Sequence, residues 1–107
     1  MNAIETRLYS LKTRIDNALP WRCGHLIDRM ADDFEPAAIA VLIELFAHTD
    51  ERATRAGRTL ARFGEAAEAP IQEYIARAAV GDLERSYAES ALERLRYRMR
   101  FTDVVGH

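Results

Sequence analysis

The sequence predicts an all-α domain in which three helix pairs stack into a short solenoid. Apolar residues recur every three or four positions, and no stretch alternates apolar and polar residues for long enough to indicate a strand. Segments that begin at Asn17, Asp50 and Asp82 repeat one apolar pattern with offsets of 33 and 32 residues. A helix-pair period in the low thirties is typical of a solenoid, in which about three pairs are the minimum for stability.

The first pair is expected over residues 2–33. One apolar stripe follows its first helix: Ile4, Leu8, Leu11 and Ile15. Pro20 ends this helix, since proline cannot continue it. Asn17 aligns with Asp50 and Asp82 and is expected, like them, to cap a second helix.

The second pair is expected over residues 36–64, with Pro36 in a first helical turn and Asp50 at an N-cap. The third pair is expected over residues 69–100, which leaves 101–107 as a C-terminal tail. All 107 residues thus form a single repeat domain.

Two positions of the repeat are expected in the core. Small residues coincide at one of them: Cys23, Ala56 and Ala88. Large residues coincide at the other: Ile27, Leu60 and Leu92. Cys23 has His25 and Asp28 close in sequence, a set with the composition of a nucleophile and its base. From a core position, however, Cys23 cannot face His25, so no catalytic residue and no enzyme are expected.

No metal and no cofactor are expected. His25, Asp28 and Asp32 share one helix face, but a structural zinc site requires four nitrogen or sulfur ligands. The glycines of "AGRTLARFG" do not form a phosphate loop, because no Gly-Lys-Ser/Thr follows them.

The second pair, "EPAAIAVLIELFAHTDERATRAGRTLARFG", runs from a proline through an apolar helix and an Asp-containing turn to an Arg-rich helix. Here the chain resembles the HEAT-repeat family in its short bacterial form. The resemblance implies a right-handed α-solenoid that serves as a rigid protein-binding scaffold without intrinsic catalysis. The family usually has Val-Arg early in its second helices. Arg85 matches that arginine, whereas Ala53 and Pro20 occupy the same place in the other two pairs.

Outward-facing residues of the second helices form three rows across the repeats: Arg22, Arg55 and Tyr87; His25, Arg58 and Ser90; and Arg29, Arg62 and Arg94. In HEAT-like stacks the second helices line the concave surface. The resemblance therefore implies that these arginines converge into a groove of positive potential, with Arg7 and Arg14 on the convex side. Glu51, Asp28, Glu89 and Glu93 lie near the rows and weaken this field.

Three interpretations of this surface remain. A groove lined with arginine and tyrosine suits an acidic protein surface, as in a small adaptor, inhibitor or immunity-type protein. The same groove could hold a nucleic-acid backbone, although the formal net charge of −2 disfavours this alternative. The third interpretation is an ordinary solvated helix face. Self-association is left open.

Trp21 stands where the other repeats have polar residues, which makes it either a lid over the end of the stack or a contact residue. The C-terminal residues Tyr97, Met99 and Phe101 either cap the core or form a second contact edge. A single cysteine fits a reducing, cytoplasmic compartment. No apolar run is long enough for a membrane span, so no membrane partner is expected.

Overall fold

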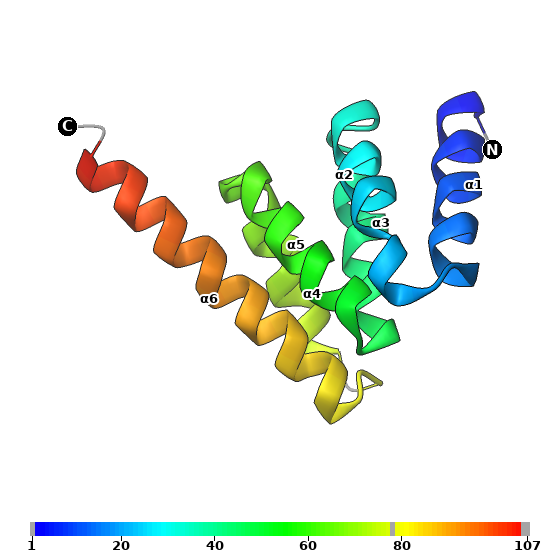
Figure 1. The fold of residues 1–107 in the computed structure, drawn as a ribbon. Helices are drawn as coiled ribbons and strands as arrows, with labels where there is room; N and C mark the ends of the chain where they lie inside the picture. The colour runs from blue at the N-terminus through cyan, green and yellow to red at the C-terminus, as the bar shows by residue number, and fades with distance from the viewer. Residues whose placement is uncertain (1, 78, 106–107) are drawn as a thin grey trace.

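The structure, a computed structural model, describes residues 2–77 and 79–105, with 102–105 described by their backbone alone. All regular secondary structure along these residues is helical (Figure 1). The first pair comprises α1 (Ala3–Asn17) and α2 (Gly24–Asp33), with the short 3-10 helix η1 (Pro20–Arg22) between them. The second comprises α3 (Ala38–Glu44) and α4 (Glu51–Leu60), with η2 (Leu45–His48) between them. After η3 (Ala61–Phe63), the third comprises α5 (Glu65–Ala76) and α6 (Asp82–Val105). The predicted all-α class is confirmed for the described part of the chain.

The helices lie in two rows. α1, α3 and α5 follow one another, each in contact with the next, and α2, α4 and α6 do the same. Contacts between α1 and α2, α3 and α4, and α5 and α6 join the rows. Figure 1 shows α6 running past the ends of α4 and α5 toward the C-terminus. α4 is the central helix of its row, because it packs against both α2 and α6.

The core follows the repeat positions. Cys23, Ala56 and Ala88 are fully buried, and the large residues Ile27, Leu60 and Leu92 are buried with them. Both sets of predicted core positions are thus confirmed. α4 and α6 approach so closely at Gly57 that an added Cβ would lie 3.1 Å from the Cβ of Ala91. A glycine at this point therefore lets the two helices pack backbone to backbone.

The first pair departs from the repeat at its turn. Asn17 does not cap α2 but ends α1, and its Nδ2 donates to the carbonyl oxygen of Thr13 at 2.8 Å. The reason is local: Pro20, Trp21 and Arg22 form a separate 3-10 turn, so α2 begins only at Gly24. In the second pair Asp50 is the N-cap of α4 as predicted, and its Oδ1 accepts from the backbone N–H of Arg52 at 2.9 Å.

Two helix ends also differ from expectation. α5 begins at Glu65, earlier than the expected position 69. α6 continues to Val105, so residues 101–105 are helical where a tail was expected. The physical reason is that no proline or glycine interrupts 101–105. Residues 106–107 of the expected tail lie outside the described residues.

No helix in the described ranges has both the length and the apolar composition that a bilayer crossing requires.

Candidate functional site

The arginine series of α4 and η3 divides into three different environments. Arg52 is the most buried member, with a side chain only 12% exposed. Its Nε and Nη2 donate to the carboxylate of Asp50, with Nη2 at 2.6 Å from Oδ2, and this contact raises the pKa of Arg52. Its Nη1 donates to two carbonyl oxygens in the last turn of α1, those of Ile15 at 3.2 Å and Asp16 at 3.0 Å. Arg52 is therefore a structural residue that caps another helix.

Arg55 of α4 and Arg62 of η3 both form ion pairs with α2. Arg55 pairs with Asp28, and Arg62 pairs with Asp32. The hydrogen bond from Arg55 holds the pKa of Asp28 below its ordinary value, and the hydroxyl of Thr59 adds a donor at 3.3 Å. Both guanidinium groups are partly exposed, but their charge is compensated within the molecule.

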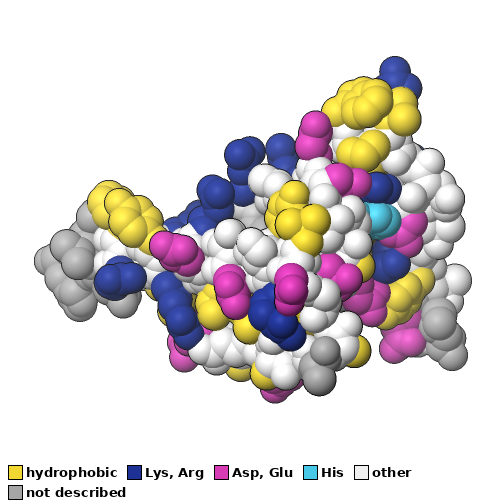
Figure 2. All heavy atoms as spheres, turned by 90° about the horizontal axis from the view of Figure 1, so that it is seen from below, with side chains coloured by type: hydrophobic (Ala, Val, Ile, Leu, Met, Phe, Trp, Pro, Cys, Tyr) yellow, Lys and Arg dark blue, Asp and Glu magenta, His cyan; other side chains and the backbone are white. Residues whose placement is uncertain are grey.

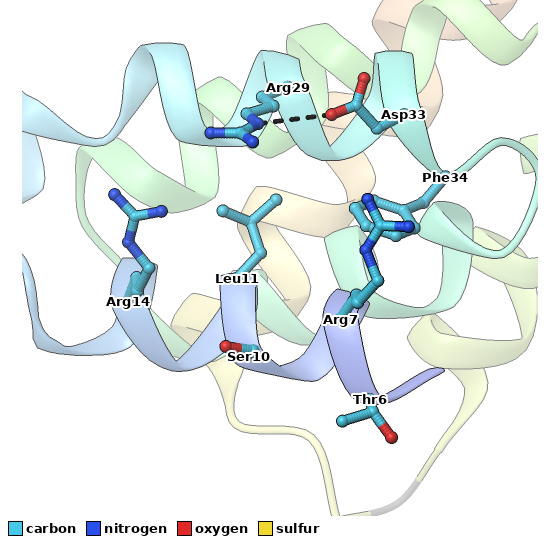
Figure 3. A pocket seen from close by; sticks show the side chains of 8 residues that line it. All are labelled: Thr6, Arg7, Ser10, Leu11, Arg14, Arg29, Asp33 and Phe34. Atoms are coloured by element: carbon cyan, nitrogen blue, oxygen red, sulfur yellow. Dashed lines mark hydrogen bonds and ion pairs between the residues drawn. The ribbon is translucent and has the colours of Figure 1, made fainter. Parts of the chain in front are cut away.

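Arg29 does not join this row. Neighbouring residues on a helix point about 100° apart, so Asp28 and Arg29 cannot both face α4. Asp28 and Asp32, four residues apart, take the α4 side of α2, and Arg29 turns toward α1. There its Nε lies 3.3 Å from Oδ2 of Asp33, the ion pair drawn in Figure 3. The expected row of Arg29, Arg62 and Arg94 is thus broken at its first member.

Tyr87 also differs from expectation, because its side chain was predicted to face outward in the row with Arg22 and Arg55. It is half-buried against the core, and its hydroxyl donates to the carbonyl oxygen of Thr49 at 3.4 Å. The hydroxyl therefore ties α6 to the turn before α4, which is a structural contact.

Of the six candidate arginines, the pairs above leave three without an ion pair inside the described part of the chain: Arg22, Arg58 and Arg94. Figure 2 shows a run of Lys and Arg side chains along one edge of the molecule, and other Lys and Arg side chains scattered among Asp and Glu over the rest of the view. The continuous positive groove expected from the sequence is therefore reduced to separate basic positions.

Trp21, Arg55 and Arg58 come together around one hollow between η1 and α4. Its volume is about 310 Å³, and its other lining residues are Pro20, Gly24, Glu51 and Thr54. The Trp21 side chain is 66% exposed, and Arg55 is held against Gly24 beside its partner Asp28. Arg58 is exposed on α4. We call this the Trp21 hollow. It combines a flat apolar ring, one fixed guanidinium and one uncompensated guanidinium.

Arg22 directly follows Trp21 in sequence and His25 directly follows Gly24, two residues that line the hollow, and both side chains are exposed. Arg94 lies elsewhere, in a hollow on α6 with Tyr97 and Arg100. The structure therefore gathers part of the predicted set between η1 and α4 and separates the rest.

A second hollow was missed by sequence reasoning. Between α1 and α2, Arg7, Arg14 and Arg29 surround an apolar floor of Leu11 and Phe34 (Figure 3). Its volume is about 320 Å³, and the Arg7 Cζ atom lies 5.7 Å from the centre of the Phe34 ring. The available signal was the i, i+4, i+7 spacing of Arg7, Leu11 and Arg14, which places them along one helix side. Arg7 and Arg14 had been expected on the convex side, away from any site.

Cys23 and His48 both make structural contacts. Cys23 is fully buried, its Sγ lies 3.3 Å from the carbonyl oxygen of Leu19, and burial raises the pKa of its thiol. Within the described ranges, no cluster of three His, Cys, Asp or Glu residues is arranged to hold a metal ion. His48 pairs with Asp16 at 2.6 Å, and so helps to fix the end of α1.

No protein-family model matches this chain, and no curated protein or solved structure does so either.

Proposed function

We propose that the chain is a cytoplasmic, non-enzymatic protein-interaction module built as a short right-handed HEAT-like solenoid. Its ligand in this proposal is an acidic protein surface, bound at the Trp21 hollow. The observation that carries the proposal is the exposure of Trp21 beside an uncompensated Arg58. Tryptophan and arginine dominate the energetics of protein interfaces.

The solenoid part is supported by the two rows of helices. Each pair contacts the next within both rows, as expected when neighbouring pairs bury each other's faces. Arg85, the residue that matches the arginine of the HEAT pattern, donates to the carbonyl oxygens of Ile75 and Arg77, both at 3.0 Å. It thus caps the end of α5, as Arg52 caps the end of α1.

The mode of binding follows from the charges around the hollow. Asp28 fixes the Arg55 guanidinium before any ligand arrives, which reduces the entropy cost of using it as a donor. Arg58 and the neighbouring Arg22 supply free positive charge for partner carboxylates. Trp21 supplies flat apolar area. Glu51 at the rim repels a carboxylate, so the acidic groups of the partner are directed toward Arg22 and Arg58.

A nucleic-acid backbone is the alternative ligand. One observation favours it, namely an exposed indole next to free guanidinium groups, the combination on which unpaired bases stack. The net charge of −2 and the ion pairs of Arg55 and Arg62 argue against it, since nucleic-acid domains present a continuous basic surface.

Trp21 is the only tryptophan in the chain, so its fluorescence reports directly on the hollow. Titration with a glutamate-rich synthetic peptide that contains leucine should shift the emission maximum. The double variant Arg22→Glu/Arg58→Glu should lose this response. The matched variant Arg7→Glu/Arg14→Glu, which alters the other hollow, should keep it.

A single-stranded oligonucleotide titrated in parallel tests the alternative. A fluorescence shift with the oligonucleotide alone, weakening steeply with salt, would replace the acidic partner by a nucleic acid. No response to either probe would show that neither class of ligand is bound at the Trp21 hollow.

A further inference from the structure

The outer face of α6 is a separate feature of the molecule. On its inner side, Leu92 and Leu95 are buried and Met99 packs partly against the core. On its outer side, three large apolar side chains are exposed: Leu83 at 58%, Tyr97 at 68% and Phe101 at 60%. α6 therefore carries apolar residues on two opposite sides, although the molecule itself covers only one of them.

The exposed residues follow the spacing of a helix contact. Leu83, Ser90 and Tyr97 are seven residues apart, and Phe101 follows Tyr97 by four. This is the heptad spacing by which one helix packs along another. A hollow of about 340 Å³ lies on the same side, lined by Ser90, Glu93, Arg94, Tyr97 and Arg100. Its size suits one large side chain from an opposing helix.

The charges on α6 are divided along its length. Four of its five acidic residues stand in the N-terminal part, together with Arg85: Asp82, Glu84, Glu89 and Glu93; the fifth, Asp103, follows the arginine run near the end of the helix. The C-terminal part has a run of arginines instead: Arg94, Arg96, Arg98 and Arg100. Glu84 accepts from the Tyr74 hydroxyl at 2.8 Å and Arg96 pairs with Glu68 at 3.4 Å, so these two are used within the chain. Glu89, Glu93, Arg94 and Arg100 have no ion pair within the described residues.

We infer that this outer face of α6 binds the same face of a second copy of the chain, with the two helices antiparallel. That arrangement places the acidic half of each α6 against the basic half of the other, at both ends of the contact. A parallel arrangement would instead oppose like charges along the whole helix. The antiparallel pair is closed by a two-fold axis, as in most soluble homodimers, and the axis passes near Arg94.

The shape of the molecule agrees with a second copy of the chain as the partner of this face. The C-terminal half of α6 extends past α5, and Figure 2 shows hydrophobic side chains close to that protruding end. Exposed apolar side chains on a protruding helix mark a contact surface. An anionic membrane surface fits less well, because Glu89 and Glu93 would be brought against it together with the arginines.

Sedimentation equilibrium of the full chain over a concentration series tests this interface. The wild type should reach twice the chain mass of 12.2 kDa, and Tyr97→Glu should remain at the chain mass. Glu89→Arg/Glu93→Arg should also be monomeric, since it brings new arginines against the arginine run of the other copy. Arg94→Glu/Arg100→Glu should be monomeric too, since it brings new glutamates against the acidic residues of the other copy. Arg7→Glu/Arg14→Glu, remote from α6, should dimerise like the wild type.

Mixing the two charge variants is the decisive step, because the arginines introduced in one variant face the glutamates introduced in the other. A one-to-one heterodimer is expected from the mixture, provided that circular dichroism shows each variant to be helical. If either charge variant is unfolded, the comparison of the wild type with Tyr97→Glu carries the test. A wild type that stays monomeric, a Tyr97→Glu variant that still dimerises, or folded charge variants that fail to associate would each overturn the inference.

Discussion

Arg52 of α4 donates from Nη1 to the carbonyl oxygen of Asp16 in α1, at 3.0 Å. The two residues are far apart in sequence, and the contact joins the first helix pair to the second. The last carbonyl groups of a helix have no partner within that helix, so a guanidinium from elsewhere can satisfy them. The same guanidinium is held by Asp50, the N-cap of its own helix. One side chain thus links the end of one helix to the start of another.

Replacing Arg52 should therefore destabilise the fold more than replacing an ordinary exposed arginine. We expect Arg52→Ala to lower the free energy of unfolding by about 2–3 kcal/mol, because charge-assisted hydrogen bonds are lost and Asp50 is left without its partner. Arg52→Lys should recover only part of this, since lysine lacks the planar fork. Urea denaturation measures both. A loss below about 0.5 kcal/mol, typical of a surface substitution, would contradict the capping role.

The four arginines of α4 and η3 show how far sequence reasoning reaches. Their spacing predicted a helix with one polar side, and the structure has that helix. Their roles could not be predicted, because each role depends on a residue from another helix. Arg52 meets the end of α1, Arg55 meets Asp28, Arg62 meets Asp32, and Arg58 meets no acidic side chain within the described residues.

The core can be tested at Leu60, which is fully buried in α4. Leu60→Ala should lower the free energy of unfolding by about 2–5 kcal/mol, since the lost burial and the remaining cavity both contribute. Ile4→Ala is the matched control, because Ile4 is 57% exposed although it belongs to the apolar stripe of α1. Thermal melts followed by circular dichroism should each show one transition. Equal losses in the two variants would contradict the observed core.

Ile4 and Asn17 illustrate why element boundaries were harder to predict than helices. Periodicity alone places Ile4 in the buried stripe, but among the described residues no second helix covers the first turn of α1, and burial begins at Leu8. The repeat alignment assigned Asn17 to an N-cap, but the turn at Pro20 delays α2 until Gly24. Both differences come from the first pair, which has a neighbour on one side only.

Cys23 should be unreactive in the folded protein. It is fully buried, and burial raises the pKa of its thiol, so little thiolate is present at neutral pH. Alkylation should be slow under native conditions and fast in denaturant. Cys23→Ala should keep the helical circular dichroism spectrum, as alanine occupies the equivalent position in both other pairs. Rapid native alkylation would instead indicate an activated thiol.

The ion pair between Arg55 and Asp28 should make part of the stability depend on pH. Because the hydrogen bond from Arg55 lowers the pKa of Asp28 below the ordinary 3.8, its contribution is present above that value. It is lost as the pH falls through the lower, folded-state value. Arg55→Gln should cost at most about 1 kcal/mol at neutral pH, since the pair is partly exposed.

The stability difference between the wild type and Arg55→Gln should then shrink as the pH falls below about 4. Urea denaturation at several pH values measures it. Arg98→Gln, a change at an exposed arginine of α6, is the control and should show no such trend. A difference that stays constant down to acid pH would mean that the ion pair does not stabilise the fold.

The most direct test of the binding surface uses the native partner, captured from source cells with the tagged chain and then purified. Its affinity is to be measured for three forms: the wild type, Trp21→Ala/Arg58→Glu, and Arg7→Glu/Arg14→Glu. An acidic partner at the Trp21 hollow predicts a loss of at least about tenfold in the first variant, equivalent to about 1.4 kcal/mol, and little change in the second. Unchanged affinity in Trp21→Ala/Arg58→Glu would contradict the proposed site, and a loss confined to Arg7→Glu/Arg14→Glu would move it to the hollow between α1 and α2.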